Sequence, residues 1–250
     1  MIIEYLKWDS DFFEKRIASA SVGPSERETE VITEILSYKN RYDLVYINTP
    51  GDYFFSDEVL SSQNLLHVDS KLVYHGVVEN AKHDFDKQIT VYSSKEVNPD
   101  LLSLSLQSGA YSRYKKDKNF TDNEFERLYT KWIENSINGS IADAIFIYRE
   151  VYTDICEDEG KIIGMVTVSA DKVSDSAKIG LIAVDQSAQN KGVGSKLMDA
   201  VKTYASNHSL RNIEVATQLE NKQACAFYEK CGFSIKSKTN VYHFRFNDRL

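Results

Sequence analysis

Cysteine, proline and long apolar runs are scarce in this chain of 250 residues. Its three cysteines, Cys156, Cys225 and Cys231, are odd in number and form no C-x-x-C pair, so neither a disulfide framework nor a zinc site is indicated. We therefore expect reduced thiols and no bound metal. Only three prolines stand beside 15 tyrosines and 12 phenylalanines, a composition typical of an ordered chain without a low-complexity linker.

An excess of positive charge is also missing. The 30 basic and 37 acidic residues give a net charge of -7, which disfavours general binding to nucleic acid through its phosphates. Met1–Ile3 is followed at once by Glu4 and Lys7, without the apolar stretch of a signal peptide. A membrane span needs about 18 consecutive apolar residues, and no such run occurs. We expect a soluble cytoplasmic protein with neither nucleic acid nor a membrane as partner.

The length suits one large domain or two modest ones, and 42% hydrophobic residues suffice for a packed core. The stretch 79–86, ENAKHDFD, is polar and lacks periodicity, which predicts a boundary between a domain over 1–85 and another over 86–250. A short echo links them, because SKLVYH at 70–75 recurs as SK at 237–238 and VYH at 241–243. Either chance explains the match, or the first domain is a truncated copy of the second half of the main domain.

Hydrophobic periodicity and turn residues predict alternating strands and helices. Predicted strands cover 2–6, 16–22, 43–48, 88–93, 144–148, 160–169, 176–184 and 213–217, with one or two over 67–78 and two after the last helix. Predicted helices cover 25–40, 57–66, 98–106, 191–207 and 221–230, and a longer one begins at Thr121. Ser25 and Thr121 are the expected N-caps of their helices, and Glu124 completes a capping box. We expect the strands 144–148 and 160–169 to form a hairpin, and Trp132 to lie in the core.

The most informative stretch is 179–196, IGLIAVDQSAQNKGVGSK, an apolar strand that ends in a glycine-rich turn before a helix. Such a turn gathers unpaired backbone N–H groups at the positive end of a helix dipole, which suits a pyrophosphate. Its spacing, Q-x-x-G-x-G over 189–194, is neither that of a P-loop nor that of a Rossmann turn. The alternative is an ordinary strand-to-helix turn whose glycines allow close packing.

This turn resembles the acyl-CoA loop of the GCN5-related N-acetyltransferases, the GNAT family, and the predicted order of elements is the one that family uses. The resemblance implies an α/β (α+β) fold with a central mixed, mostly antiparallel sheet, splayed at the acyl-CoA site and flanked by helices, and here a smaller N-terminal α/β domain. It also implies acetyl-CoA as co-substrate. The residues that would bind it are Ile182, Ala183 and Val184 on the splayed strand, Gln189, Asn190, Lys191, Gly192, Val193, Gly194 and Ser195 in the loop, and Asn221 at the next helix. A plain core strand and a plain helix cap are the alternatives for the strand and for Asn221.

Tyr228 is the expected catalytic residue. It stands in ACAFYEKCGF, where a tyrosine followed by Gly232–Phe233 resembles a family signature, and the resemblance places it near the thioester sulfur. When a neutral amine attacks the thioester, the phenol can protonate the departing thiolate, because pKa values of about 10 and about 8.5 are close enough for general acid catalysis. A tyrosine that only packs in the core is the alternative. The sequence indicates no general base.

Scattered identities resemble one branch of the family, the bacterial enzymes that N-acetylate TDP-linked 4-amino-4,6-dideoxy sugars such as TDP-fucosamine. They lie in 8–13, 17–18, 111–114, 129–135 and 215–228. The resemblance implies a nucleotide-sugar amine as the small-molecule substrate and a role in polysaccharide biosynthesis; a homodimer is one possible assembly. Arg113 and Tyr114 would bind that substrate, since the planar fork of arginine suits a diphosphate. A solvated charged loop is the alternative.

Two departures from that branch leave the exact sugar open: the phosphate loop is longer, and Phe227 replaces an arginine beside the tyrosine. Two other functions also stay open, namely N-acetylation of another small amine or a protein amine, and acyl-CoA sensing without turnover. The matching N-terminal portion argues against the first, and a proton donor at Tyr228 argues against the second. His75, His83 and His243 have no partners at metal-ligand spacing.

Overall fold

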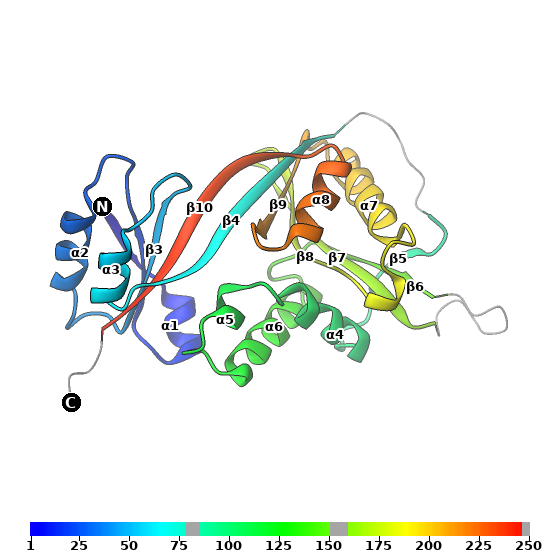
Figure 1. Cartoon of the computed structure of the whole chain (residues 1–250). Coiled ribbons are helices and arrows are strands. Elements are labelled where there is room, and N and C mark those ends of the chain that lie inside the picture. Colours follow the sequence, from blue (N-terminus) through cyan, green and yellow to red (C-terminus); the bar gives the residue numbers. More distant parts are fainter. Residues whose placement is uncertain (79–85, 151–159, 247–250) are drawn as a thin grey trace.

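The computed structural model describes residues 1–78, 86–150 and 160–246. They contain one sheet of ten strands, in the order β1-β2-β3-β10-β4-β9-β8-β7-β6-β5 (Figure 1). The strands are β1 Ile2–Tyr5, β2 Ile17–Ser21, β3 Leu44–Pro50, β4 Leu66–Val77, β5 Ile89–Val91, β6 Ala144–Arg149, β7 Ile162–Asp171, β8 Ser176–Val184, β9 Asn212–Gln218 and β10 Ser234–Arg245. The helices are α1 Lys7–Phe13, α2 Glu28–Ser37, α3 Asp57–Ser62, α4 Pro99–Ser108, α5 Arg113–Lys116, α6 Asp122–Ile137, α7 Val193–Asn207 and α8 Lys222–Lys230, with a short 3-10 turn over Gln186–Ala188.

The sheet is mixed and mostly antiparallel, as predicted. Only β2 with β3 and β8 with β9 run parallel among the described strands. Each parallel pair is joined by a helix, α2 or α7, because parallel neighbours need a crossover connection. The expected hairpin of β6 and β7 is confirmed by their antiparallel register, although residues 158–159 of its expected turn lie outside the described part of the chain.

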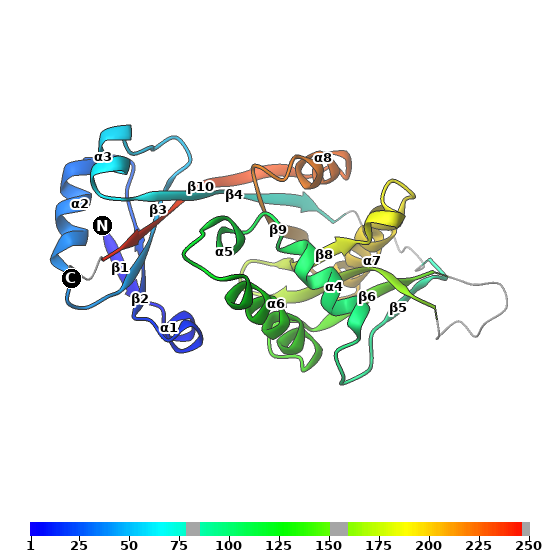
Figure 2. The ribbon, with the colours of Figure 1, turned by 60° about the horizontal axis from the view of Figure 1, so that its bottom comes forward.

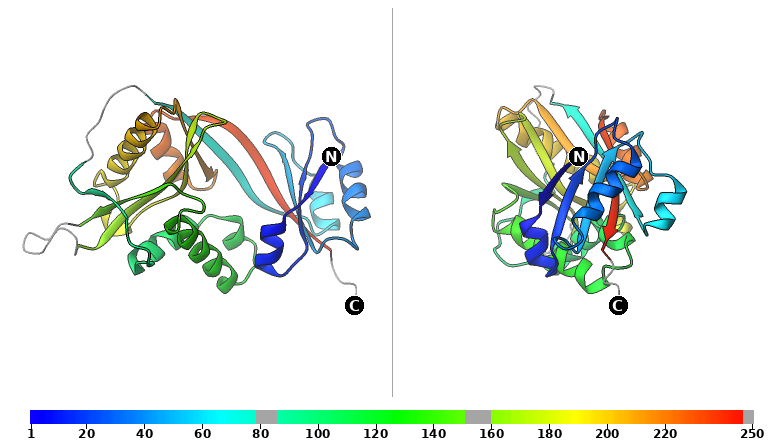
Figure 3. Two further views of the ribbon diagram at one scale, coloured as in Figure 1. Left: turned by 180° about the vertical axis from the view of Figure 1, so that it is seen from behind. Right: turned by 90° about the vertical axis from the view of Figure 1, so that its left-hand side faces the viewer.

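Helices cover both faces of the sheet. In Figure 2, α4 and α6 lie over the strands β6 to β8 on one face, and Figure 3 shows α7 on the opposite side. The described residues form three apolar cores, one of which packs α2 on the N-terminal strands through Val31, Ile32 and Ile35. The other two follow from this layering. Leu101, Leu128 and Ile133 are buried under the first face, while Leu197 and Val201 of α7 are buried under the second. None of the described helices has the length and apolar content of a membrane span.

Local signals explain most helix ends. The capping box of α6 is present, with the Glu124 backbone N–H donating to Thr121 Oγ1 and the Glu124 carboxylate accepting from the Thr121 N–H. The predicted cap Ser25 is wrong: α2 has Arg27 at its N-cap and ends at Ser37. The chain turns at Gly23, whose N–H donates to the Glu26 carboxylate at 2.5 Å, and the helix begins two residues later than predicted from Ser25, without a side-chain cap.

The last predicted pair of strands is a single one. β10 runs without a break from Ser234 to Arg245, because its two register shifts, at 235–237 and at 241–242, bend the strand without ending it. β10 and β4 lie side by side and cross between the two ends of the molecule (Figure 1). The C-terminal part of β10 pairs with β3, and β4 pairs on its other side with β9.

Two segments therefore share one connectivity. We call β2–α2–β3–α3–β4, residues 17–77, the first unit, and β8–α7–β9–α8–β10, residues 176–245, the second unit. The third strand of each unit pairs with the second strand of the other. The echo of SKLVYH lies on these exchanged strands, with Ser70 opposite Asn240 and Val73 opposite Ser237. The division at residues 79–85 lies outside the described residues and stays a prediction; the sheet is continuous across it.

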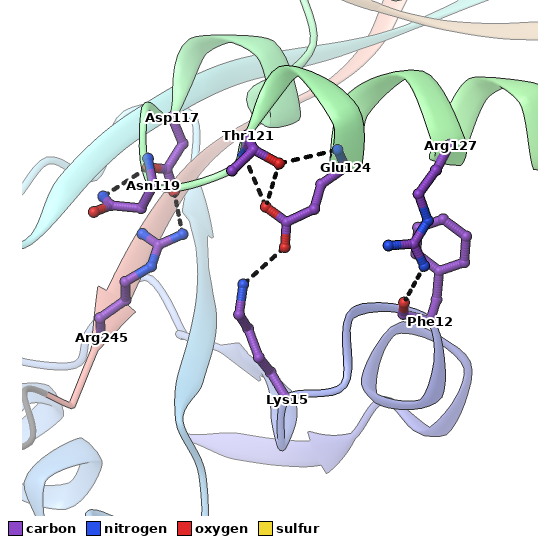
Figure 4. A network of polar contacts seen from close by, with 8 residues as sticks. All are labelled: Phe12, Lys15, Asp117, Asn119, Thr121, Glu124, Arg127 and Arg245. Atoms are coloured by element: carbon purple, nitrogen blue, oxygen red, sulfur yellow. Dashed lines mark hydrogen bonds and ion pairs between the residues drawn. The ribbon is translucent and has the colours of Figure 1, made fainter.

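Polar contacts also fasten the N-terminal segment to α6 (Figure 4). Lys15 Nζ lies 2.9 Å from the Glu124 carboxylate, the same group that completes the capping box. An Arg127 N–H donates to the Phe12 carbonyl at 3.5 Å. At the other end of the network, Asp117 forms an ion pair with Arg245 of β10 at 2.6 Å. The helices that lie under the second unit are thus tied to strands and turns of both ends of the chain.

Candidate active site

A cavity of 1270 Å³ lies where β8 and β9 separate. Its walls come from β4, β9 and β8 of the sheet, from the turn before α7, and from α8, α4, α5 and α6. It therefore connects residues from distant parts of the chain. The predicted loop, the predicted proton donor and the predicted substrate residues all contribute to this one cavity.

The separation is visible in the strand register. Parallel pairing of β8 with β9 ends at Ile179 opposite Val215, yet β8 continues to Val184 and β9 to Gln218. Residues 180–184 and 215–218 line the cavity from its two sides. The predicted Ile182, Ala183 and Val184 are among them. Beyond Ile179, the edge of β8 that faces β9 has no strand partner among the described residues, so its backbone groups are open to a ligand.

Side chains modify this open edge. Gln107 of α4 donates through Nε2 to the Val184 carbonyl at 2.6 Å, and Gln189 donates to the same oxygen at 3.3 Å. On the β7 side, a bulge at Thr167 lets its hydroxyl accept from the Leu181 N–H at 2.8 Å. The Val184 carbonyl is therefore occupied, and the free edge is the stretch before it.

The glycine turn opens towards the same cavity. Asn190 and Gly192 have φ values of 61° and 84°, the left-handed region that favours glycine. Gly192 is the N-cap of α7 and offers no side chain to the first-turn N–H groups, so these donors remain for a ligand. At Gly194 a Cβ would lie 3.2 Å from the Phe227 ring, which explains both the glycine and the aromatic residue beside Tyr228.

The predicted loop residues divide by position. Gln189, Asn190, Gly192, Gly194 and Ser195 line the cavity. Lys191 is exposed, and Val193 is buried in the core below the turn. A side-chain bond of 2.9 Å from Gln223 of α8 to Gln189 joins the turn to the next helix.

Asn221 and Tyr228 stand at the start and in the body of α8. Asn221 is the N-cap, because its Oδ1 accepts from the Ala224 N–H at 3.1 Å; it also lines the cavity. Tyr228 is only 3% exposed and packs on Tyr74, with ring centroids 5.4 Å apart. Burial raises the pKa of the Tyr228 phenol, so the group that lines the cavity is the protonated form, which can donate.

Arg113 and Tyr114 form the far wall. The Arg113 guanidinium lies 4.3 Å from the Tyr46 ring centroid and donates to the Tyr114 hydroxyl at 2.8 Å. Its Nε is buried without a hydrogen-bond partner among the described residues. The Tyr114 hydroxyl in turn donates to Asp9 at 3.3 Å. The guanidinium is therefore held against Tyr46 and Tyr114 in the wall of the cavity. The alternative of a solvated loop is wrong for this residue.

Sequence reasoning missed the residues that β4 contributes. Asp69 and Lys71 line the cavity beside Arg113, and burial raises the pKa of Asp69 to about 6 and lowers that of Lys71. The available signal was two charged residues at alternate positions, on one face of the strand LHVDSKLVYHGV. Trp132, expected in the core, is half-buried and lines the cavity as well.

No group of metal-ligating side chains occurs among the described residues. Cys225 is buried and Cys231 is half-buried, both as free thiols. Cys156 lies outside the described part of the chain.

Comparison with known proteins places this site in context. Residues 112–233 match the model of the Acetyltransferase (GNAT) family. An uncharacterized N-acetyltransferase of Methanocaldococcus jannaschii is 28% identical over 165 residues, which cover 63% of this chain and 67% of that protein. The spore coat polysaccharide biosynthesis protein SpsD of Bacillus subtilis is 20% identical over 254 residues, covering 97% of this chain and 82% of that protein.

A solved structure shares the fold. A GCN5-related N-acetyltransferase from Sphaerobacter thermophilus superimposes with a TM-score of 0.56 at 12% identity, over 94% of this chain and 74% of that chain. At this identity the likeness concerns the fold alone. It extends over both units and the helices that lie below them.

Proposed function

We propose that this protein, an acyltransferase of the GNAT acetyltransferase family, transfers the acetyl group of acetyl-CoA to the amino group of a nucleotide-linked amino-dideoxy sugar. The observation that carries the proposal is the one cavity whose lining includes the glycine turn and Tyr228 together with Arg113 and Lys71. One end suits a coenzyme and the other suits an anionic acceptor. The reaction needs both in one space.

The coenzyme end fits acetyl-CoA part by part. N–H groups around Gly192 and the N-terminus of α7 offer donors and a positive dipole end to a diphosphate. The open edge of β8 before Val184 offers backbone groups to the amides of an extended pantetheine arm. Asn221, already the cap of α8, has an amide N–H₂ left for the same arm. The protonated Tyr228 would stand at the sulfur.

The chemistry then needs little rearrangement. A neutral amine attacks the thioester carbonyl carbon, and negative charge develops on the carbonyl oxygen. Backbone donors of β8 can stabilise that oxygen, an effect of about 3 to 4 kcal/mol per donor in other enzymes. As the C–S bond breaks, Tyr228 gives its proton to the sulfur. The buried phenol keeps that proton until the sulfur needs it.

The acceptor end suits a sugar nucleotide. Arg113 and Lys71 supply two cations for a diphosphate, and arginine can make two parallel hydrogen bonds to it. Tyr111 and Trp132 offer aromatic surface to a sugar or a base. The similarity to a protein named for polysaccharide biosynthesis extends over the first unit as well as the second, which favours a substrate that contacts both.

An acceptor panel tests the proposal. Thiol release from acetyl-CoA is followed with TDP-4-amino-4,6-dideoxyhexoses, the free amino sugars, small polyamines and lysine peptides. We expect the TDP-linked amines to exceed the free sugars in kcat/KM by about tenfold or more, since a charge-assisted pair contributes about 1.5 to 3 kcal/mol.

The matched variant is Arg113→Lys, which keeps the charge and removes the planar fork. It should reduce the preference for the TDP-linked amine and leave the free sugar unchanged. Turnover of peptides alone would overturn the proposal. Tight acetyl-CoA binding without any turnover would instead favour a sensor.

A further inference from the structure

Acetyl transfer to an amine requires a proton acceptor, because an alkyl amine is mostly protonated at neutral pH and cannot attack in that form. The cavity lining contains one carboxylate, Asp69, and neither histidine nor cysteine among the described residues. Its lysines, Lys71 and Lys230, are cations in their ordinary state. Asp69 is therefore the lining group that can take a proton near neutral pH.

The position of Asp69 suits the acceptor end. Lys71 pairs across the sheet with Gln218, the last residue of β9, and Asp69 lies two residues further on the same face of β4, about 7 Å away. Beyond Gln218, no β9 residue pairs with β4. Asp69 thus stands where the cavity passes the end of β9 and meets Arg113 of α5. This is the side from which an acceptor, and not the coenzyme, would enter.

Asp69 also differs from the other buried carboxylates nearby. Asp117 is bound by His243 and Arg245, and Asp9 accepts from Tyr114. The Asp69 side chain forms no hydrogen bond or ion pair with any described residue. Its oxygens are nevertheless not fully buried, unlike Arg113 Nε, which is buried without a partner among the described residues. A carboxylate that is 8% exposed and opens only to a cavity is available to a ligand there.

The charges around Asp69 set its proton affinity. Burial is the main cause that raises its pKa to about 6, and Glu220 acts in the same direction. Arg113 and Lys116 of α5 and Lys71 of β4 lower it. The other titratable groups near it are Tyr129 of α6 and His67 of β4. A base with a pKa just below the working pH is ionised and still accepts a proton readily.

We propose that Asp69, a residue of the first unit, is the general base that takes a proton from the acceptor amine, directly or through one water. The proposal rests on the proposed acetyl transfer to an amine, but not on the identity of the sugar. The ammonium group gives one proton to Asp69, the amine nitrogen bonds to the acetyl carbon, and the C–S bond breaks. Tyr228 protonates the sulfur and is restored, through solvent, by the second proton of the nitrogen. The proton on Asp69 leaves to solvent.

Asp69→Asn tests this with a variant of nearly equal shape. At pH about 7 we expect its acetylation rate to fall on the order of 100-fold, the usual contribution of a general base. The rate of the native protein should rise with pH through about 6, because only the carboxylate acts. In the variant this rise should move to the pKa of the free amine, so that the two rates converge at high pH. A residue needed only for structure would not produce that convergence.

Two control variants separate the local charges. Glu220→Gln removes an exposed carboxylate that raises the pKa of Asp69; it should keep the rate at pH about 8 and move the acidic limb to lower pH. Lys71→Met should keep the acidic limb of the pH–rate profile and move it to higher pH, because Lys71 lowers the pKa of Asp69. If Lys71→Met abolishes the limb and Asp69→Asn does not, the base is Lys71 and the proposal is overturned.

A second readout does not need turnover. With ¹³C-labelled aspartate, one carboxyl resonance should titrate near pH 6 in the native protein and be missing in Asp69→Asn, while acetyl-CoA affinity and melting temperature stay unchanged. A titration curve that Asp69→Asn leaves intact would contradict the proposal. If TDP-linked sugars are not acetylated but another amine of the panel is, the proposed substrate fails and the rate test is run on that amine.

Discussion

The two units have the same order of elements but differ at the turn that enters the first helix. In the first unit, the turn contains the protein's own carboxylate, Glu26, which accepts from the Gly23 N–H and pairs with the Met1 ammonium group. Neither helix receives a side-chain cap, since the N-caps are Arg27 and Gly192. In the second unit, Gly192 caps α7 without any side chain, and the turn opens into a cavity. The same strand-to-helix connection is thus closed in one unit and open in the other. An open helix N-terminus is what an anionic ligand requires.

The strands differ in the same sense. β2 and β3 pair along the whole length of β2, whereas β8 and β9 separate after Ile179 and Val215. The fourth element differs in length, since α3 has six residues and α8 has nine, including Tyr228. The shared connectivity supports the proposal that the first unit is a truncated copy of the second. The differences fit the proposed function, in which only the second unit binds acetyl-CoA and the first contributes Asp69 and Lys71 of β4 to the cavity.

The largest effect is expected where the segment between α5 and α6, which belongs to neither unit, is joined to β10 of the second unit. Asp117 is fully buried against β10, with His243 Nδ1 at 2.5 Å and Arg245 at 2.6 Å. Asp117→Asn should lower the free energy of unfolding by about 3 to 5 kcal/mol, because it removes the negative charge that His243 and Arg245 contact in the buried site. Chemical denaturation at pH 7 measures this, with the exposed Asp122→Asn as control. A loss below about 1 kcal/mol would mean that the joint contributes little.

The same joint gives a pH dependence with a definite sign. Burial opposes ionisation, but the hydrogen bond from His243 and the nearby Arg245 lower the pKa of Asp117, and burial lowers that of His243 to about 4. Both groups bind fewer protons folded than unfolded. Stability should therefore be complete above the unfolded histidine pKa of about 6.5 and decline as pH falls through about 4. Asp117→Asn should keep the part of the decline above pH about 4, because that part comes from His243, whose pKa Asp117 raises and whose pKa falls further without it.

Tyr228→Phe tests the proposed proton donor, which lies on α8 of the second unit. The variant should slow acetyl transfer about tenfold or more and leave acetyl-CoA affinity nearly unchanged, because the lost hydroxyl acts on the leaving sulfur. Tyr74→Phe is the matched control: its ring packs on Tyr228, but its hydroxyl donates to Glu229 and does not line the cavity. Full activity of Tyr228→Phe would show that another group protonates the thiolate.

The two turns can be compared directly by adding one methyl group to each. Gly192→Ala forces a side chain into the left-handed region, which costs about 1 to 2 kcal/mol and should weaken acetyl-CoA binding roughly tenfold. Gly23→Ala should have no effect on binding, because its Cβ would meet only the Glu26 carboxylate at an ordinary 3.6 Å. Isothermal titration calorimetry measures both. Equal losses in the two variants would break the distinction between the turns.

Glu26→Gln has the smallest expected effect. It removes the charge of a half-buried carboxylate that accepts from Gly23 and pairs with the Met1 ammonium group, and we expect a loss of stability of about 1 kcal/mol or less, as for a partly exposed ion pair. Acetyl-CoA should still bind with one molecule per chain. A second binding equivalent in this variant would mean that the first unit retains a latent coenzyme site.

Local signals allowed much of the second unit to be predicted. The strand 176–184 agrees with β8 at both ends, and the capping box at Thr121 is present as expected. Where prediction was wrong, longer-range packing decided. No local signal shows that Ser25 is not the helix cap. The turn is fixed by the bond from Gly23 to Glu26, and α2 begins after Arg27. Two strands were predicted where β10 is one, because its continuity depends on pairing with β3 and β4 across the register shifts.

The site shows the same division. Gln189–Gly194, Asn221 and Tyr228 follow one another within the second unit, so a contiguous pattern could predict them. Asp69 and Lys71 reach the cavity only because β4 is inserted between β10 and β9. Sequence spacing carries no information about such an exchange of strands. Arg113 and Tyr114 were predicted from sequence, but the contribution of Asp69 and Lys71 to the cavity could be found only in three dimensions.

The exchange of β4 and β10 has a consequence for synthesis on the ribosome. When the nascent chain has emerged as far as β4, both of that strand's neighbours, β9 and β10, have still to be translated. β3 likewise keeps one bare edge until Arg245 has been made. Exposed strand edges pair with foreign chains, so newly made protein should depend on chaperones until its last strand closes the sheet.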